Sequence, residues 1–138
     1  MYRPAFTALL TATFFTAPTA QAQMTDASTI RPILEATKAN WIGVRRWDGQ
    51  DLVYFTHLET WKCGLKSIRY GINSEEATKR YAFKACKDDE AAPSPVATDR
   101  LPYIAFVLDS VESVTITLTY DDGMEVTETF DRAAVEIP

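Results

Sequence analysis

The sequence predicts a mainly β (α+β) fold: an antiparallel sheet, or a small sandwich or partly open barrel of about six to seven strands, with one short N-terminal helix and one disulfide. Three observations predict it. After Asn40, β-branched and aromatic residues dominate, and short apolar runs alternate with turn-forming residues. Before it, a single segment has helical spacing. The chain contains two cysteines.

The first 22 residues have the order of a secretory signal peptide. The basic residue Arg3 is followed by an uncharged run from Ala5 to Ala17 and by the small-residue ending Ala20-Gln21-Ala22. We therefore expect cleavage after Ala22 and a single exported, globular β-rich domain over residues 23–138, periplasmic or extracellular. The apolar run is shorter than the ~20 residues that a bilayer requires, so no membrane span is expected.

The helix is expected over Thr29–Ala39, with Ser28 or Thr29 as its cap. A first hairpin is expected next, with strands near 41–47 and 52–58 that place Trp47 opposite Leu52. Both faces of this hairpin are largely apolar, so we expect the helix to cover one face and the rest of the sheet the other.

Cys63 and Cys86 predict a disulfide, because thiols of an exported chain normally become oxidised. Both cysteines are equidistant from Ser74-Glu75. A two-residue turn there would set the cysteines opposite one another, within disulfide reach, and would pair Ile68 with Tyr81. A bulge near 64–67 is also expected, because the apolar positions change parity there.

The C-terminal half begins with a long loop over 87–102, rich in acidic residues and proline. A buried strand is expected over 103–108, and a hairpin over 111–130. A three-residue loop, Asp121-Asp122-Gly123, suits this hairpin best because it places Leu118 opposite Val126. A short terminal strand is expected over 133–137.

One residue of this last hairpin conflicts with its pattern. Glu128 falls opposite Ile116 on the apolar face, which indicates an edge strand or an unidentified partner for the carboxylate. Asp121 and Asp122 lack the spaced oxygen ligands of a calcium loop and are interpreted as turn residues.

The charge is unevenly distributed along the chain. Residues 23–87 hold 11 basic and 7 acidic side chains, whereas residues 88–138 hold 2 basic and 12 acidic ones. Either the acidic half binds a protein partner that is cationic, or the two halves lie side by side in one sheet and complement each other. A net acidic domain repels polyanions, so no nucleic acid partner is expected.

The densest group of aromatic and basic residues is the candidate binding surface: Trp41, Arg45, Trp47, Tyr54 and Trp61. If one sheet face is uncovered, these rings could stack on a ligand or a peptide, with an arginine over an aromatic ring. The alternative is that the same residues form the core and dock the helix.

His57, the only histidine, is a weak catalytic candidate. Two cysteines and one histidine are too few for a metal site, and the chain has no phosphate loop, dinucleotide fingerprint or nucleophile elbow, so no metal and no cofactor are expected. The leading hypothesis is that the protein is a non-catalytic binding or envelope-accessory module that recognises a protein partner. The alternatives are a small hydrolase-like or ligand-processing enzyme that uses His57, and a structural component of an envelope assembly.

Overall fold

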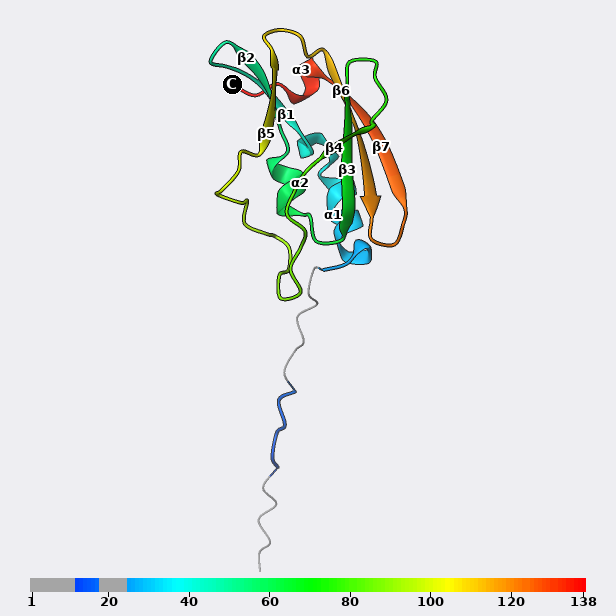
Figure 1. Cartoon of the computed structure of the whole chain (residues 1–138). Helices are drawn as coiled ribbons and strands as arrows, with labels where there is room; N and C mark the ends of the chain where they lie inside the picture. The colour runs from blue at the N-terminus through cyan, green and yellow to red at the C-terminus, as the bar shows by residue number, and fades with distance from the viewer. Residues whose placement is uncertain (1–11, 18–24) are drawn as a thin grey trace, which may run out of the picture.

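The chain forms two antiparallel sheets, one of three strands in the order β1-β2-β5 and one of four strands in the order β4-β3-β6-β7 (Figure 1). A few short helices and one disulfide complete the fold, so the predicted fold class is confirmed. The elements are α1 (Ala27–Ala36), the 3-10 turn η1 (Lys38–Asn40), β1 (Gly43–Trp47), β2 (Gln50–Tyr54), α2 (Thr56–Thr60), β3 (Leu65–Ile72), β4 (Lys79–Tyr81), β5 (Tyr103–Val107), β6 (Ser113–Tyr120), β7 (Glu125–Asp131) and α3 (Arg132–Val135).

This computed structural model describes residues 12–17 and 25–138. The basic residue and the cleavage site of the predicted signal peptide fall in 1–11 and 18–24, outside the described residues. No helix of the described part is long and apolar enough to cross a membrane.

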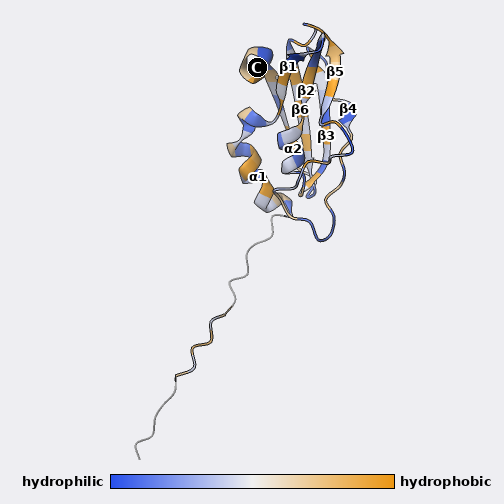
Figure 2. Ribbon diagram, turned by 90° about the vertical axis from the view of Figure 1, so that its left-hand side faces the viewer, coloured by the Kyte–Doolittle hydropathy of each residue, from blue (hydrophilic) through white to orange (hydrophobic). Residues whose placement is uncertain are grey.

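Helix α1 lies to one side of the strands, and the core fills the space between them (Figure 2). Ile30 and Leu34, one turn apart on α1, have no exposed surface. The predicted cap was wrong: the Asp26 carboxylate accepts the backbone N–H of Thr29 at 3.0 Å, so the helix begins two residues earlier than expected. It also ends at Ala36, where η1 takes over.

The first hairpin has a tighter turn than expected. Its turn is Asp48-Gly49, and both residues have positive φ angles, 51° and 73°. Such a turn matches the twist of the flanking strands, so Trp47 pairs with Gln50 rather than with Leu52. The predicted register is therefore wrong by two residues.

The second strand of this hairpin ends at Tyr54, not near residue 58. Phe55 and Leu58, three residues apart, are fully buried, and this spacing suits the helix α2 that replaces the expected strand end. The Phe55 ring stacks on Tyr81 of β4, with centroids 4.0 Å apart. The turn into α2 thus ties the three-stranded sheet to the four-stranded one.

The predicted Cys63–Cys86 disulfide is present, with the two Cα atoms 5.1 Å apart. The predicted pairing of Ile68 with Tyr81 is also confirmed. The cysteines, however, lie outside the strands, Cys63 two residues before β3 and Cys86 five residues after β4. Residues 73–78 form a longer connection than the expected two-residue turn. The expected irregularity near 64–67 occurs in the pairing of β3 with β6.

The last hairpin follows the prediction. Leu118 pairs with Val126, and Gly123 has a φ of 85°, as a three-residue loop requires. Glu128 is opposite Ile116 on the edge strand β7, and its carboxylate contacts Lys38 Nζ at 2.6 Å. Both explanations offered for this residue are therefore correct.

Two further expectations for the C-terminal half were wrong. Strand β5 is only partly buried, because it is the outer strand of its sheet. Residues 132–135 form the helix α3 rather than a strand, and only a single parallel bridge, Val44 to Glu136, follows it. The loop 87–102 has no helix or strand, as predicted.

Candidate functional site

The structure brings together three of the five predicted binding residues. Val44 and Val53, opposite each other on β1 and β2, are fully buried on the core side of the three-stranded sheet. Because side chains alternate along a strand, Arg45, Trp47 and Tyr54 lie on the opposite side. The sheet thus has an inner face toward the core and an outer face away from it.

Strand β5 adds further apolar and aromatic residues to this surface. We call this side of the three-stranded sheet the outer face. Its members are Arg45, Trp47, Leu52, Tyr54, Tyr103, Ala105 and Val107. The Arg45 guanidinium lies 4.2 Å from the centroid of the Trp47 ring, a cation–π contact. The rings of Tyr54 and Tyr103 are neighbours across β2 and β5, with centroids 5.1 Å apart.

The outer face is exposed at the end that carries the β1–β2 turn. Trp47 is 56% exposed and Val107 is 77% exposed, and both flank Gln50 in one row across the sheet. Leu101 and Leu108, just before and after β5, are exposed as well. Large apolar side chains gathered on one part of a small domain are typical of a contact surface.

Of the other two aromatic candidates, Trp41 is in the interior and Trp61 is partly buried against the core. Trp41 has no exposed surface, and its indole Nε1 donates to the Leu34 carbonyl oxygen at 2.8 Å. Trp61 is partly buried against the core near His57, with ring centroids 6.5 Å apart. For these two residues the structure shows the core role that the sequence left open.

His57 lies on α2, half-buried, and its Nε2 is 2.9 Å from the Thr37 hydroxyl oxygen. That hydroxyl is also 2.7 Å from the Ile33 carbonyl oxygen. Since the hydroxyl has one proton, and the carbonyl can only accept, the threonine donates to Ile33 and His57 Nε2–H donates to the threonine. The neutral ring then carries its lone pair on Nδ1, which makes no hydrogen bond to the described residues.

Burial lowers the pKa of His57 below its ordinary value of 6.5, which favours the neutral ring. The ring lines an open cavity of about 510 Å³ together with Asn40, Tyr54, Thr56 and Thr60. In the described part of the chain no carboxylate bonds to His57, and its one hydroxyl partner has already donated its proton. The geometry supplies a neutral base but no oriented acid–base pair.

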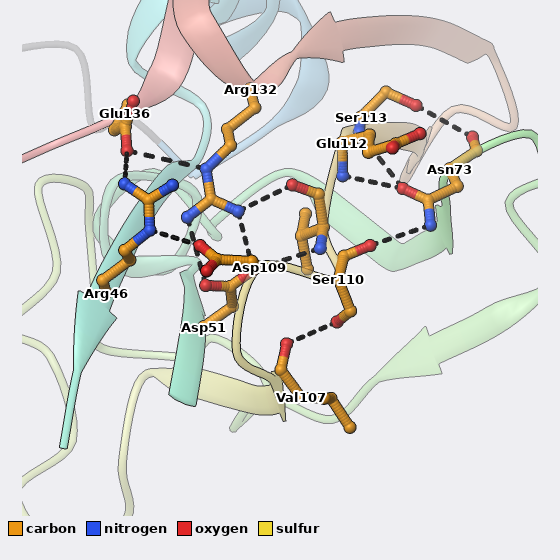
Figure 3. Close-up of polar contacts among 11 residues, drawn as sticks. Arg46, Asp51, Asn73, Val107, Asp109, Ser110, Glu112, Ser113, Arg132 and Glu136 are labelled. Carbon is orange, nitrogen blue, oxygen red and sulfur yellow. Dashed lines mark hydrogen bonds and ion pairs between the residues drawn. The ribbon is translucent and has the colours of Figure 1, made fainter. Parts of the chain in front are cut away.

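A buried ion pair that the sequence analysis missed holds the inner side of the same sheet to the rest of the fold (Figure 3). Asp51 on β2 is fully buried and faces Arg132 of α3 at two contacts, of 2.6 Å and 3.1 Å. The Arg132 hydrogen bond lowers the pKa of Asp51 to about 2. Asp51 also accepts the Val111 N–H at 3.1 Å, which fixes the β5–β6 connection.

The charges around this pair extend to the surface. Arg46 bonds to Asp109 and, at 3.0 Å, to Glu136, and it lies beside the buried pair (Figure 3). On the other side of the β5–β6 connection, Asn73 accepts the N–H of Glu112 at 2.8 Å. This connection is therefore anchored to both sheets. The pattern of apolar residues along the sequence does not predict these polar contacts, because they join residues that are far apart in the chain.

Seven of the twelve acidic residues of the second half form ion pairs with basic residues of the first half. Ion pairs between basic residues of the first half and acidic residues of the second are Arg31–Asp122, Lys38–Glu128, Arg46–Asp109, Arg46–Glu136, Lys62–Glu90, Arg69–Glu125 and Lys84–Asp99. This arrangement matches the second explanation of the charge asymmetry, in which the halves complement each other. Within residues 12–17 and 25–138, no three His, Cys, Asp or Glu side chains gather as metal ligands would.

In comparisons with known proteins, no protein-family model, no curated protein and no solved structure matches this chain.

Proposed function

We propose that this protein is an exported, non-catalytic binding module that recognises a protein partner through the outer face of its three-stranded sheet. The observation that carries the proposal is the Trp47 ring, which is 56% exposed and has the Arg45 guanidinium 4.2 Å from its centroid. Tryptophan and arginine are frequent at interface hot spots. A tryptophan side chain provides a large contact area and loses little entropy on binding, because it has only two rotatable side-chain angles.

The chemistry of the outer face suggests what the partner presents. Arg45 has an aromatic neighbour but no ion pair with any described residue, so its charge is uncompensated. Trp47, Val107 and Leu108 next to it are exposed apolar groups. We therefore propose a protein surface with apolar side chains and a carboxylate for Arg45, rather than the cationic partner suggested by the net charge of the acidic half.

Two features support export. The order of Arg3, the uncharged run and Ala20-Gln21-Ala22 is that of a signal peptide. The Cys63–Cys86 disulfide is stable in the oxidising space that export leads to. A periplasmic or extracellular setting is part of the proposal.

The geometry favours binding over catalysis. An enzyme that uses His57 would need a carboxylate to orient the ring or a hydroxyl ready to give up its proton. Thr37 is the hydroxyl in contact, and its proton is directed to Ile33. In the envelope-assembly alternative, the loop 87–102 would become ordered only on binding. The disulfide next to it and the hydrogen bond from Ser94 N–H to the Thr60 carbonyl oxygen, at 2.7 Å, hold this loop to the domain and so do not favour that alternative.

The test is affinity capture with the full chain, immobilised under non-reducing conditions and exposed to the exported fraction of its source organism. We expect a stoichiometric protein that binds the native chain and is lost with Trp47→Ala. Arg45→Gln should weaken capture at low salt, and rising salt should reduce the difference between the two chains, because an exposed ion pair is screened.

Met124→Ala is the matched control, because Met124 is also 56% exposed but lies at the β6–β7 turn, outside the outer face. Capture should survive this substitution. Equal loss with Trp47→Ala and Met124→Ala, or a captured protein that ignores both, would show that the outer face is not the binding surface. Circular dichroism of each variant checks that the fold is intact.

A further inference from the structure

Strand β5 has one edge that pairs with no other strand of the described chain. Strand β5 is the last strand of its sheet and pairs only with β2. At the opposite edge of the same sheet, the C-terminal segment covers β1, since the Ile137 N–H donates to the Val44 carbonyl oxygen at 2.8 Å. The molecule thus covers one edge of this sheet and leaves the other open.

The direction of the backbone groups of β5 follows from its pairing. The Phe55 N–H donates to the Pro102 carbonyl oxygen at 2.8 Å, which makes these two residues a hydrogen-bonded pair at the start of the ladder. Hydrogen-bonded pairs alternate along an antiparallel ladder, so Ile104 and Phe106 bond to β2. Tyr103, Ala105 and Val107 therefore direct their N–H and C=O groups away from the sheet.

These outward groups have little competition within the molecule. In the described part of the chain, the exception is the Val107 carbonyl oxygen, which accepts from the Ser110 N–H at 3.0 Å and from the Ser110 hydroxyl at 2.5 Å (Figure 3). The five residues Tyr103–Val107 include no charge and no proline, and the pairing of β5 with β2 has no bulge. Proteins normally protect an edge strand with a charge, a proline or a bulge, because an unprotected apolar edge pairs with other strands.

We propose that β5 is a dimerisation edge, on which a second copy of this chain adds its own β5 in the antiparallel direction about a two-fold axis at Ala105. In this register Ala105 lies opposite the partner's Ala105, and Tyr103 lies opposite the partner's Val107. These are the residues whose backbone groups point outward, so the pairing leaves the β2 ladder unchanged. The new hydrogen bonds join the two Ala105 residues and run from the Val107 N–H to the carbonyl oxygen of the partner's Tyr103, while the Val107 carbonyl oxygen stays bonded to Ser110.

The side chains also fit this arrangement. The exposed Val107 would meet the partner's Tyr103 on the outer face, which removes the most exposed apolar residue of the strand from water. On the inner side, Ile104 would meet the partner's Phe106. Since β5 has no charged residue, the two copies do not repel one another at the new ladder.

The dimer would have a continuous six-stranded sheet, formed from β1-β2-β5 of each copy, and two outer faces that adjoin across the axis. This inference does not depend on the proposed function. A chain that dimerises and captures no other protein, or one that captures a protein as a monomer, would separate the two proposals.

The test uses Ala105, which is exposed and lies on the proposed axis. We expect the full-length wild-type chain to be a dimer at micromolar concentrations in sedimentation or light scattering. Ala105→Lys and Ala105→Glu each place two like charges opposite one another and should each weaken dimerisation about tenfold or more. An equimolar mixture of the two variants should regain a dimer, because lysine then faces glutamate.

The matched controls are Ala133→Lys and Ala133→Glu, at an exposed alanine of α3. They should dimerise as the wild type does, alone and mixed. A wild-type chain that is monomeric, an Ala105→Lys chain that dimerises as strongly as wild type, or a mixture that stays monomeric while each variant is folded by circular dichroism, would each overturn the proposal.

Discussion

Asp51 and Arg132 are 81 positions apart in the sequence and face each other through two contacts in the interior of the fold. One residue is on β2, and the other opens α3. Their ion pair connects β2 of the three-stranded sheet to α3, which directly follows β7 of the four-stranded sheet. The pair therefore holds the two sheets together.

Replacing Arg132 should be far more damaging than replacing a surface arginine. Arg132→Ala leaves the fully buried Asp51 carboxylate without its cation, which costs about 3–5 kcal/mol in comparable buried pairs. Arg46→Ala is the control, because the contacts of Arg46 with Asp109 and Glu136 are largely exposed and contribute less than about 1 kcal/mol. Urea unfolding of both variants measures the two losses. Equal losses would show that Asp51 is not dependent on Arg132.

The same carboxylate predicts how stability changes in acid. The folded pKa of Asp51 is about 2, below its ordinary value of 3.8, so its contribution is complete above pH 3.8 and is lost as the pH falls toward 2. Asp51→Asn cannot titrate. The stability curves of wild type and Asp51→Asn should therefore converge by about 2 kcal/mol between pH 5 and pH 2. Parallel curves over this range would contradict the lowered pKa.

The disulfide should contribute a large part of the stability. Cys63 and Cys86 are 23 positions apart, and closing a loop of this length restricts the unfolded chain by about 3 kcal/mol in the chain-entropy treatment. The double variant Cys63→Ser, Cys86→Ser should lose this amount in urea unfolding, and a reductant should no longer change its midpoint. Intact mass of the native chain should rise by two hydrogens on reduction; an unchanged mass would contradict the bond.

Gly71 and Gly123 should differ in their response to alanine. A Cβ at Gly71 would lie 2.4 Å from the carbonyl oxygens of Glu75 and Glu76, which belong to the β3–β4 connection. At Gly123 the space is open and only the positive φ of 85° opposes a side chain. We expect Gly71→Ala to cost about 3 kcal/mol or more and Gly123→Ala about 1 kcal/mol in thermal or urea unfolding. The reverse order would contradict the close approach at Gly71.

His57 gives a spectroscopic test of its own, since it is the only histidine. Nitrogen-15 spectra should show the Nε2–H form of the ring and a pKa below 6.5, because burial disfavours the charged ring. The unfolded chain takes up this proton first, so stability should fall as the pH drops below 6.5. Thr37→Val should perturb the Nε2 signal. A ring in the Nδ1–H form would show that Nε2 accepts from Thr37, and would favour the catalytic hypothesis.

Local rules were enough where both partners lie close in the sequence. The β6–β7 register followed from the match of Leu118 to Val126 and from the glycine at Gly123, and the disulfide followed from Cys63 and Cys86 being the only cysteines. The β1–β2 register failed because apolar residues on both faces fit more than one alignment, and the Asp48-Gly49 turn decided between them.

The candidate site depended more on long-range packing. The sequence identified Arg45, Trp47 and Tyr54 as a group. The pairing of β2 with β5 adds Tyr103 and Val107 to this group, and the tertiary packing buries Trp41 in the core instead. The pairing of Asp51 with Arg132 could not be predicted, since neither residue type is unusual at its position and no local spacing relates them.

The covering of β1 by the C-terminal segment affects when the protein can fold. Residues 132–137 provide both the cation for the buried Asp51 and the backbone contact of Ile137 with Val44. Both contacts are made by residues that follow every strand of the three-stranded sheet in the chain order. The strands β1, β2 and β5 are therefore synthesised before the cation that the buried Asp51 carboxylate requires, and Asp51 has no ionic partner until synthesis has passed Arg132.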